Sequence, residues 1–135
     1  MATIEISYPG GVKVDVSYKG HTLRTDQPVS AGGENSAMSP FDVFLASIAA
    51  CMGLYALRFC QERQIAIEGL RLTLNPVKSE DKSRIAKLEA ELALPGGFPA
   101  KYHAAILRAM EHCSVKQHIL TPPEFEVKIV ETVLA

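Results

Sequence analysis

The sequence lacks the charge pattern of several common classes of protein. It has no run of five like charges, and its 14 lysines and arginines nearly balance its 15 aspartates and glutamates, giving a formal net charge of −1. This balance argues against a nucleic-acid partner and against a polyelectrolyte tail. The N-terminus alternates apolar and polar residues and has no basic region before an apolar core, so we expect no signal peptide.

Cysteine and histidine are too few and too scattered for a disulfide framework or a metal site. The three cysteines are separated by 9 and 53 residues, an odd number at spacings that suit neither a secreted protein nor zinc. The four histidines form no i,i+4 pair, and Gly32-Gly33 fits neither a P-loop nor a Rossmann fingerprint. We therefore predict no metal and no other cofactor, and a reducing, cytoplasmic location.

No apolar run is long enough to suggest a membrane span. The uncharged stretch 43–57 has 15 residues, short of the roughly 20 that a transmembrane helix needs. We expect it to be a buried core helix and predict no membrane partner. The 135 residues suffice for one domain with a sizeable core, so a single domain over residues 1–135 is predicted.

Alternating apolar and polar residues predict strands on both sides of a long helix. The strands are expected at 4–8, 12–18, 21–25, 65–75 (with a bulge at Gly69), 84–94 and 125–133. Ser39 fits an N-cap, Pro40 the first helical position and Asp42 the acidic partner of a capping box, so a helix is predicted from there to about Gln64. A helix over 102–113 and a short one over 114–120, capped by Ser114, follow. The order βββ-α-ββ-α(α)-β is an α+β fold.

The long helix is apolar on nearly every face. Two small antiparallel sheets and one further helix cannot easily cover a helix of this kind. Burial against a second copy of the chain would cover it, and we therefore expect an obligate homodimer.

Cys51 and Cys113 are the two candidates for thiol chemistry. A thiol in an apolar helix is ordinarily inert, and Cys51 lies too far from the helix start to feel its dipole, so activation requires a cation or hydrogen-bond donors folded over it. Cys113 precedes a helix whose free N–H groups favour a thiolate; alternatively, it only completes an apolar stripe. Cys60 is expected to be a packing residue.

Two charged residues are further candidates with simpler alternatives. Asp42 is either a catalytic carboxylate or only a helix cap. Arg24 either closes over a pocket at the first loop or is a solvated strand residue. Neither position alone decides between the two interpretations.

Three segments together resemble the OsmC/Ohr family, and the resemblance extends over essentially the whole chain. They are Asp26-Gln-Pro-Val-Ser-Ala-Gly-Gly-Glu-Asn35, Ser39-Pro-Phe-Asp-Val-Phe-Leu-Ala-Ser-Ile-Ala-Ala-Cys51 and Cys113-Ser-Val115, with the two cysteines 62 residues apart. The resemblance implies an intertwined homodimer in which sheets wrap two central helices. It also implies that Cys51 attacks a hydroperoxide and that Cys113 resolves the product.

The chain departs from the peroxidases of that family at two positions. They carry Glu directly after the helix-start Pro, where this chain has Phe41, and they use an Arg from the first strands, where it has Lys13. The activating roles are therefore not transferred to Arg24 or Asp42, and the chain looks more like the general OsmC-like branch.

Two functions follow from the sequence. The first is a thiol-dependent peroxidase that reduces organic hydroperoxides or hydrogen peroxide and is restored by an external dithiol reductant. The second is a non-catalytic dimer that binds a small molecule or senses redox state.

Overall fold

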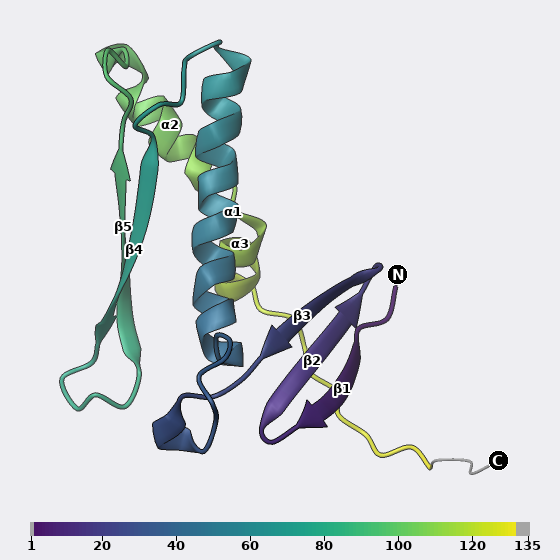
Figure 1. Ribbon diagram of the computed structural model, residues 1–135. Helices are drawn as coiled ribbons and strands as arrows, with labels where there is room; N and C mark the ends of the chain where they lie inside the picture. Colours follow the sequence, from purple (N-terminus) through teal and green to yellow (C-terminus); the bar gives the residue numbers. More distant parts are fainter. Residues whose placement is uncertain (1, 132–135) are drawn as a thin grey trace. The chain divides into compact units, whose positions relative to one another are not determined.

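The computed structural model describes residues 2–131, and Figure 1 shows the order of its elements. The strands are β1 (Glu5–Gly10), β2 (Lys13–Tyr18), β3 (His21–Thr25), β4 (Arg71–Lys78) and β5 (Ile85–Ala93); the α-helices are α1 (Pro40–Glu62), α2 (His103–Met110) and α3 (Ser114–Leu120), with 3-10 helices at Val29–Ala31 and Ala100–Tyr102. The predicted α+β class and the predicted order up to α3 are confirmed.

The chain forms two compact units. One contains the residues up to Ala50 together with Leu72–Glu91, and the other contains Cys51–Arg71 together with the residues from Leu92 on. The helix α1 and the β4–β5 pair each contribute residues to both units. The single domain over residues 1–135 stays a prediction.

An antiparallel meander, β1-β2-β3, begins the first unit. Asp15 and Arg24 lie opposite each other on β2 and β3, and their side chains form two hydrogen bonds of 2.8 and 2.9 Å. The pairing of β1 with β2 shifts register between Ser7 and Gly10. This irregularity falls where the sequence Pro9-Gly10-Gly11 predicted a turn, because proline cannot donate a ladder hydrogen bond.

The loop that leads into α1 is organised by Asp26, which is buried. Its Oδ2 accepts hydrogen bonds from the Glu34 N–H, at 3.2 Å, and from the Ser36 N–H and hydroxyl, at 3.1 and 2.6 Å. The predicted N-cap of α1 is confirmed, since the Asp42 N–H donates to Ser39 Oγ at 3.2 Å.

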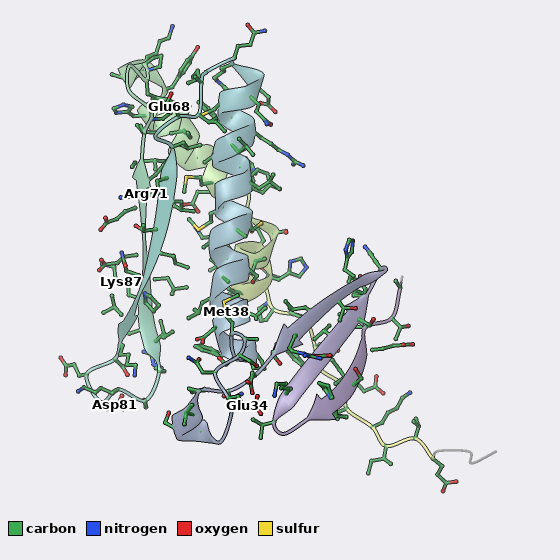
Figure 2. All side chains as sticks on the ribbon, viewed as in Figure 1. Glu34, Met38, Glu68, Arg71, Asp81 and Lys87 are labelled. Atoms are coloured by element: carbon green, nitrogen blue, oxygen red, sulfur yellow. The ribbon has the colours of Figure 1, made fainter. Side chains whose placement is uncertain are left out.

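The β4–β5 pair is a hairpin whose polar turn is held by Ser79 and Asp81. Asp81, labelled at the tip in Figure 2, accepts from the hydroxyls of Ser79 and Ser83 at 2.7 Å each. The predicted start of the first hairpin strand is wrong, because residues 65–70 contain no strand, with a turn at Glu68 and Gly69, and β4 begins at Arg71. Gly69 has a φ of 89° in such a turn, so glycine is required there by the turn and not by a bulge.

The second unit has a core built from α1 and α2. Phe59 and Cys60 of α1 and Ile106 and Met110 of α2 are at most 5% exposed. An aromatic group surrounds Phe59, with ring centroids 5.7 Å away at Tyr102 and 6.3 Å away at Phe98. The predicted helix over 102–113 ends at Met110, and Cys113 is the N-cap residue of α3.

Apolar side chains of α1 are exposed in this single chain, so the prediction of a helix that a second copy helps to surround stays a prediction. Phe41 is 56% exposed, and Phe44 and Leu54 are each 40% exposed. Over an 18-residue window the mean hydropathy is 1.8 and 22% of the window is buried. By length and composition alone α1 is able to cross a membrane, a criterion that the core helix of a globular protein also meets.

The predicted last strand is wrong for residues 125–131, which have no regular secondary structure. Phe125, Val127 and Ile129 are 88%, 93% and 98% exposed. A strand needs a neighbour to pair its backbone groups, and within the described chain this segment has none. Val133, which the prediction also included, lies outside the described residues.

Candidate two-cysteine site

Two of the predicted site residues meet in the second compact unit. Cys51 lies on α1, and Cys113 directly precedes α3. The Cys113 thiol donates a hydrogen bond to the Cys51 sulfur, and the Ser114 Oγ lies 3.8 Å from Cys51 Sγ. All three cysteines of the chain are free thiols; Cys51 is half-buried, whereas Cys60 and Cys113 are fully buried.

The surroundings of Cys51 favour its thiolate. Burial raises the pKa of Cys51, but hydrogen bonds from the Cys113 thiol, the Val115 N–H and the Ser114 hydroxyl and N–H outweigh burial. The net effect is a pKa below the ordinary value of 9.0. The groups that lower it are hydrogen-bond donors and not cations, which is one of the two routes of activation that the sequence left open.

The surroundings of Cys113 favour its neutral thiol. Burial raises its pKa, and Cys51 raises it further, although N–H groups at the start of α3 oppose the shift. The sequence left open whether the helix start would favour a thiolate at Cys113, and here burial outweighs the helix start. Cys113 does accept the Lys116 N–H, at 3.4 Å, but full burial outweighs that bond.

The N-cap residue of α3 is Cys113, and not Ser114 as the sequence predicted. As a consequence, Ser114 is the first helical residue, and its hydroxyl is available to Cys51. Sequence reasoning missed this role of Ser114 and the role of the Val115 N–H. The motif Cys113-Ser-Val115 was the available signal, but only the contact between α1 and α3 gives its second residue a function.

The three tentative residues, Arg24, Phe41 and Asp42, belong to the first unit, whereas the cysteine pair belongs to the second, so a role for them at the pair stays a prediction. Arg24 is held by Asp15 on the sheet, an ion pair that raises the pKa of Arg24 and lowers that of Asp15. Phe41 and Asp42 line a cavity of about 570 Å³ within the first unit, beside basic side chains of the hairpin such as Lys78 and Arg84. Cys60 packs in the core, where burial raises its pKa.

Comparison with known proteins identifies the family. The model of the family described as OsmC-like protein matches residues 33–128. The chain belongs to the OsmC-like protein family. The match includes both cysteines of the pair. A comparison with curated proteins gives no match.

Solved OsmC-like structures share the fold. A provisionally named osmotic stress induced and detoxification response protein from Psychrobacter arcticus 273-4 superposes with a TM-score of 0.72 at 22% identity, and 87% of each chain is covered. An organic hydroperoxide resistance protein OsmC from Legionella pneumophila, also described as a predicted redox protein and regulator of sulfide bond formation, superposes with a TM-score of 0.58 at 23% identity, covering 88% of each chain. At these identities the similarity establishes the fold.

Proposed function

We propose that this OsmC-like chain is a thiol-dependent peroxidase with a general role in redox or stress defence. One observation carries the proposal: a thiol with a lowered pKa, Cys51, receives a hydrogen bond from a second, neutral thiol, Cys113. The Legionella pneumophila neighbour is described as an organic hydroperoxide resistance protein, which supports hydroperoxides as the substrate class.

The proposed reaction has two steps on the protein. The Cys51 thiolate attacks the terminal oxygen of a hydroperoxide; the S–O bond forms as the O–O bond breaks, and the alkoxide takes up a proton to leave as the alcohol. Cys113 then gives up its proton and attacks the sulfenic sulfur of Cys51, which releases water and leaves a disulfide. An external dithiol reduces the disulfide and returns both thiols.

The two pKa shifts suit this division of roles. A nucleophile must be ionised before the peroxide arrives, and the donors around Cys51 favour that state. A resolving thiol stays neutral until the sulfenic acid has formed, as burial favours for Cys113. The hydrogen bond between the two thiols supports a direct condensation.

Peroxide consumption in the presence of a dithiol tests the proposal. Cys51→Ser should abolish consumption of cumene hydroperoxide, and Cys113→Ser should stop after one turnover at the sulfenic acid or its over-oxidised forms. Cys60→Ser is the matched control, since Cys60 is a buried thiol outside the pair, and it should retain turnover. Equal activity in all three variants would contradict the proposal.

A second function, binding or redox sensing without turnover, is favoured by the lack of the family's activating charged groups. The groups that lower its pKa include no cation, and the family's acidic position holds Phe41. In that case Cys51 would alkylate slowly, and a bound ligand would change the rate, while peroxide would not be consumed catalytically.

We propose a homodimer as the working form, in keeping with the sequence-based expectation. Two observations support it: the exposed apolar side chains of α1 and the exposed apolar side chains of Phe125, Val127 and Ile129. Both are surfaces that water solvates poorly and that a second copy would cover. A cytoplasmic location and the absence of nucleic-acid, membrane and cofactor partners stay predictions.

A further inference from the structure

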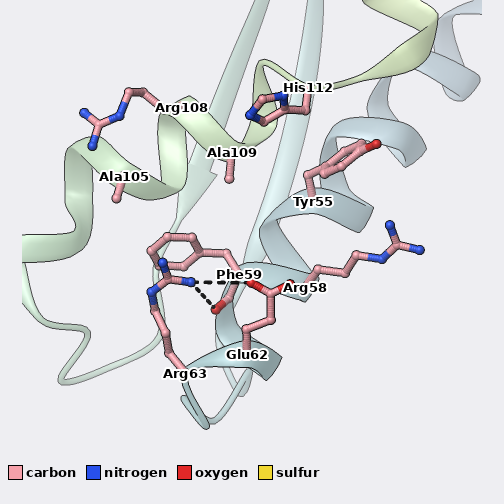
Figure 3. A pocket seen from close by; sticks show the side chains of 9 residues that line it. All are labelled: Tyr55, Arg58, Phe59, Glu62, Arg63, Ala105, Arg108, Ala109 and His112. Atoms are coloured by element: carbon pink, nitrogen blue, oxygen red, sulfur yellow. Dashed lines mark hydrogen bonds and ion pairs between the residues drawn. The ribbon is translucent and has the colours of Figure 1, made fainter.

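A basic pocket lies between α1 and α2 in the second unit (Figure 3). Its volume is about 390 Å³, within the range of roughly 300–1,000 Å³ that small-molecule sites occupy. Ala105 and Ala109, four residues apart on α2, line it with small side chains. Three arginines, Arg58, Arg63 and Arg108, also line it, against a single carboxylate, that of Glu62.

Among the described residues, Arg63 is the one of these three arginines whose guanidinium group makes a hydrogen bond or an ion pair. Arg63 lies 3.6 Å from the centroid of the Phe59 ring, donates to the Phe59 carbonyl oxygen at 3.3 Å and is 3.8 Å from the Glu62 carboxylate. These contacts occupy Arg63 and offset the pocket's only negative charge. The charge of the other two arginines is therefore not neutralised within the pocket.

Arg58 and Arg108 flank the pocket from different helices, as Figure 3 shows. Both are exposed, and among the described residues neither forms an ion pair with a carboxylate. Arg58 rests 5.9 Å from the centroid of the Tyr55 ring. Two long, exposed side chains on opposite sides of a small cavity are able to turn over a bound group, and guanidinium forks match the geometry of carboxylate and phosphate.

Apolar and aromatic surface accompanies this charge. Tyr55 and His112, whose ring centroids are 6.3 Å apart, line the same pocket as Phe59 and the two alanines. A ligand that carries an oxyanion on a flat apolar body fits these walls better than a bare ion does. We propose that the pocket binds small organic anions through Arg58 and Arg108, with a carboxylate or phosphate group as the recognised feature.

Two residues that line the pocket are close along the chain to the cysteines of the pair. Tyr55 lies one turn beyond Cys51 on α1, about 6 Å along the axis, and His112 directly precedes Cys113. The pocket is therefore built in part from the same stretches of chain as the thiol pair. The inference does not rest on peroxidase chemistry, because it holds equally for a protein that binds ligands without turning them over.

Titration of the ¹⁵N-labelled full chain with benzoate and with benzamide tests the inference by NMR. The two probes have nearly the same shape, and only benzoate is charged. Benzoate should bind in the millimolar range and shift the backbone amide signals of Arg58 and Arg108, whereas benzamide should bind far more weakly. Inorganic phosphate is the third arm: if it competes with benzoate, the site accepts oxyanions generally, and if it does not, the site is specific for carboxylates.

Matched variants locate the site. Arg58→Gln and Arg108→Gln should each weaken benzoate binding about fivefold to tenfold, the loss expected for an exposed charge-assisted hydrogen bond. Arg71→Gln, at an exposed arginine of the same unit outside the pocket, should leave binding unchanged. Equal binding of benzoate and benzamide, no binding of either anion, or equal losses in all three variants would overturn the inference. Peroxide consumption is measured separately, so a failure here is distinguishable from a failure of the proposed reaction.

Discussion

The two cysteines of the pair differ because of the groups around each sulfur atom. Cys51 is half-buried and receives hydrogen bonds from Ser114, Val115 and Cys113, while Cys113 is fully buried. Desolvation disfavours a charged sulfur, and donors favour it. The donors outweigh burial only at Cys51, so one sulfur of the pair is set up as the nucleophile and the other as the proton-bearing partner.

The pH dependence of alkylation should separate the three thiols. Because only the thiolate reacts with iodoacetamide, the rate for each cysteine rises as the pH rises through its pKa. The midpoint for Cys51 should lie below the midpoints for Cys60 and Cys113, because the pKa of Cys51 is lowered and those of the other two are raised. Quantitative mass spectrometry of native protein, alkylated briefly at a series of pH values, measures this. A midpoint for Cys51 equal to that of Cys60 would contradict the assignment.

Position 33 requires glycine because the backbone of Gln27 lies close to it in the loop before α1. A Cβ at this position would overlap the carbonyl group of Gln27, whose oxygen accepts the Asn35 N–H at 2.9 Å. Gly33→Ala should therefore lower the free energy of unfolding by about 2 kcal/mol or more. Urea denaturation measures the change. Gly96→Ala is the control, since a Cβ there meets nothing within 4 Å, and equal stability of the two variants would contradict the account.

At the scale of single elements, α1 depends on the cap at its first turn. Ser39 Oγ accepts the Asp42 N–H, which satisfies one of the backbone donors that a helix start leaves free. Ser39→Ala should cost about 1 kcal/mol of stability. Thermal and urea unfolding measure it against Ser30→Ala, an exposed serine that should be nearly neutral. A loss below that of the control would mean that the helix start is held by other contacts.

The elements that the sequence predicts well are those determined by neighbouring residues. The start of α1 follows from Ser39-Pro40, and β3 follows from the turn at Lys19-Gly20, where both residues have positive φ. The strand predictions for residues 65–70 and 125–131 were wrong. Alternation of apolar and polar residues shows that a strand is favourable, but it does not supply the partner strand with which these residues would pair.

The candidate site was predictable to a similar extent. The residues Cys51 and Cys113 came from motifs of a known family, since composition and spacing alone indicated an inert core thiol for Cys51 and left the role of Cys113 open. Which of the two sulfurs favours the thiolate was not predictable from the sequence. It depends on which thiol is more deeply buried and on the N–H groups that the contact between α1 and α3 brings to Cys51.

At the scale of the whole molecule, the exposed apolar surface predicts self-association. Sedimentation velocity at low micromolar concentration should show a species of twice 14.7 kDa. Leu54→Glu and Val127→Glu should each weaken the dimer, because the charges would be placed in surfaces that are apolar and 40% and 93% exposed in one chain. Lys101→Glu, at an exposed polar position, is the control. A folded monomer at all concentrations would contradict the proposed assembly.

Formation of a Cys51–Cys113 disulfide is the measurement that tests the account most directly. The reduced protein is treated with one equivalent of cumene hydroperoxide, quenched by alkylation and digested, and the cross-linked peptides are identified by mass spectrometry. The contact between the two thiols and the lowered pKa of Cys51 predict one dominant disulfide, between Cys51 and Cys113, with Cys60 recovered as the alkylated thiol. Recovery of Cys51 and Cys113 as unoxidised thiols, or a disulfide that involves Cys60, would contradict it.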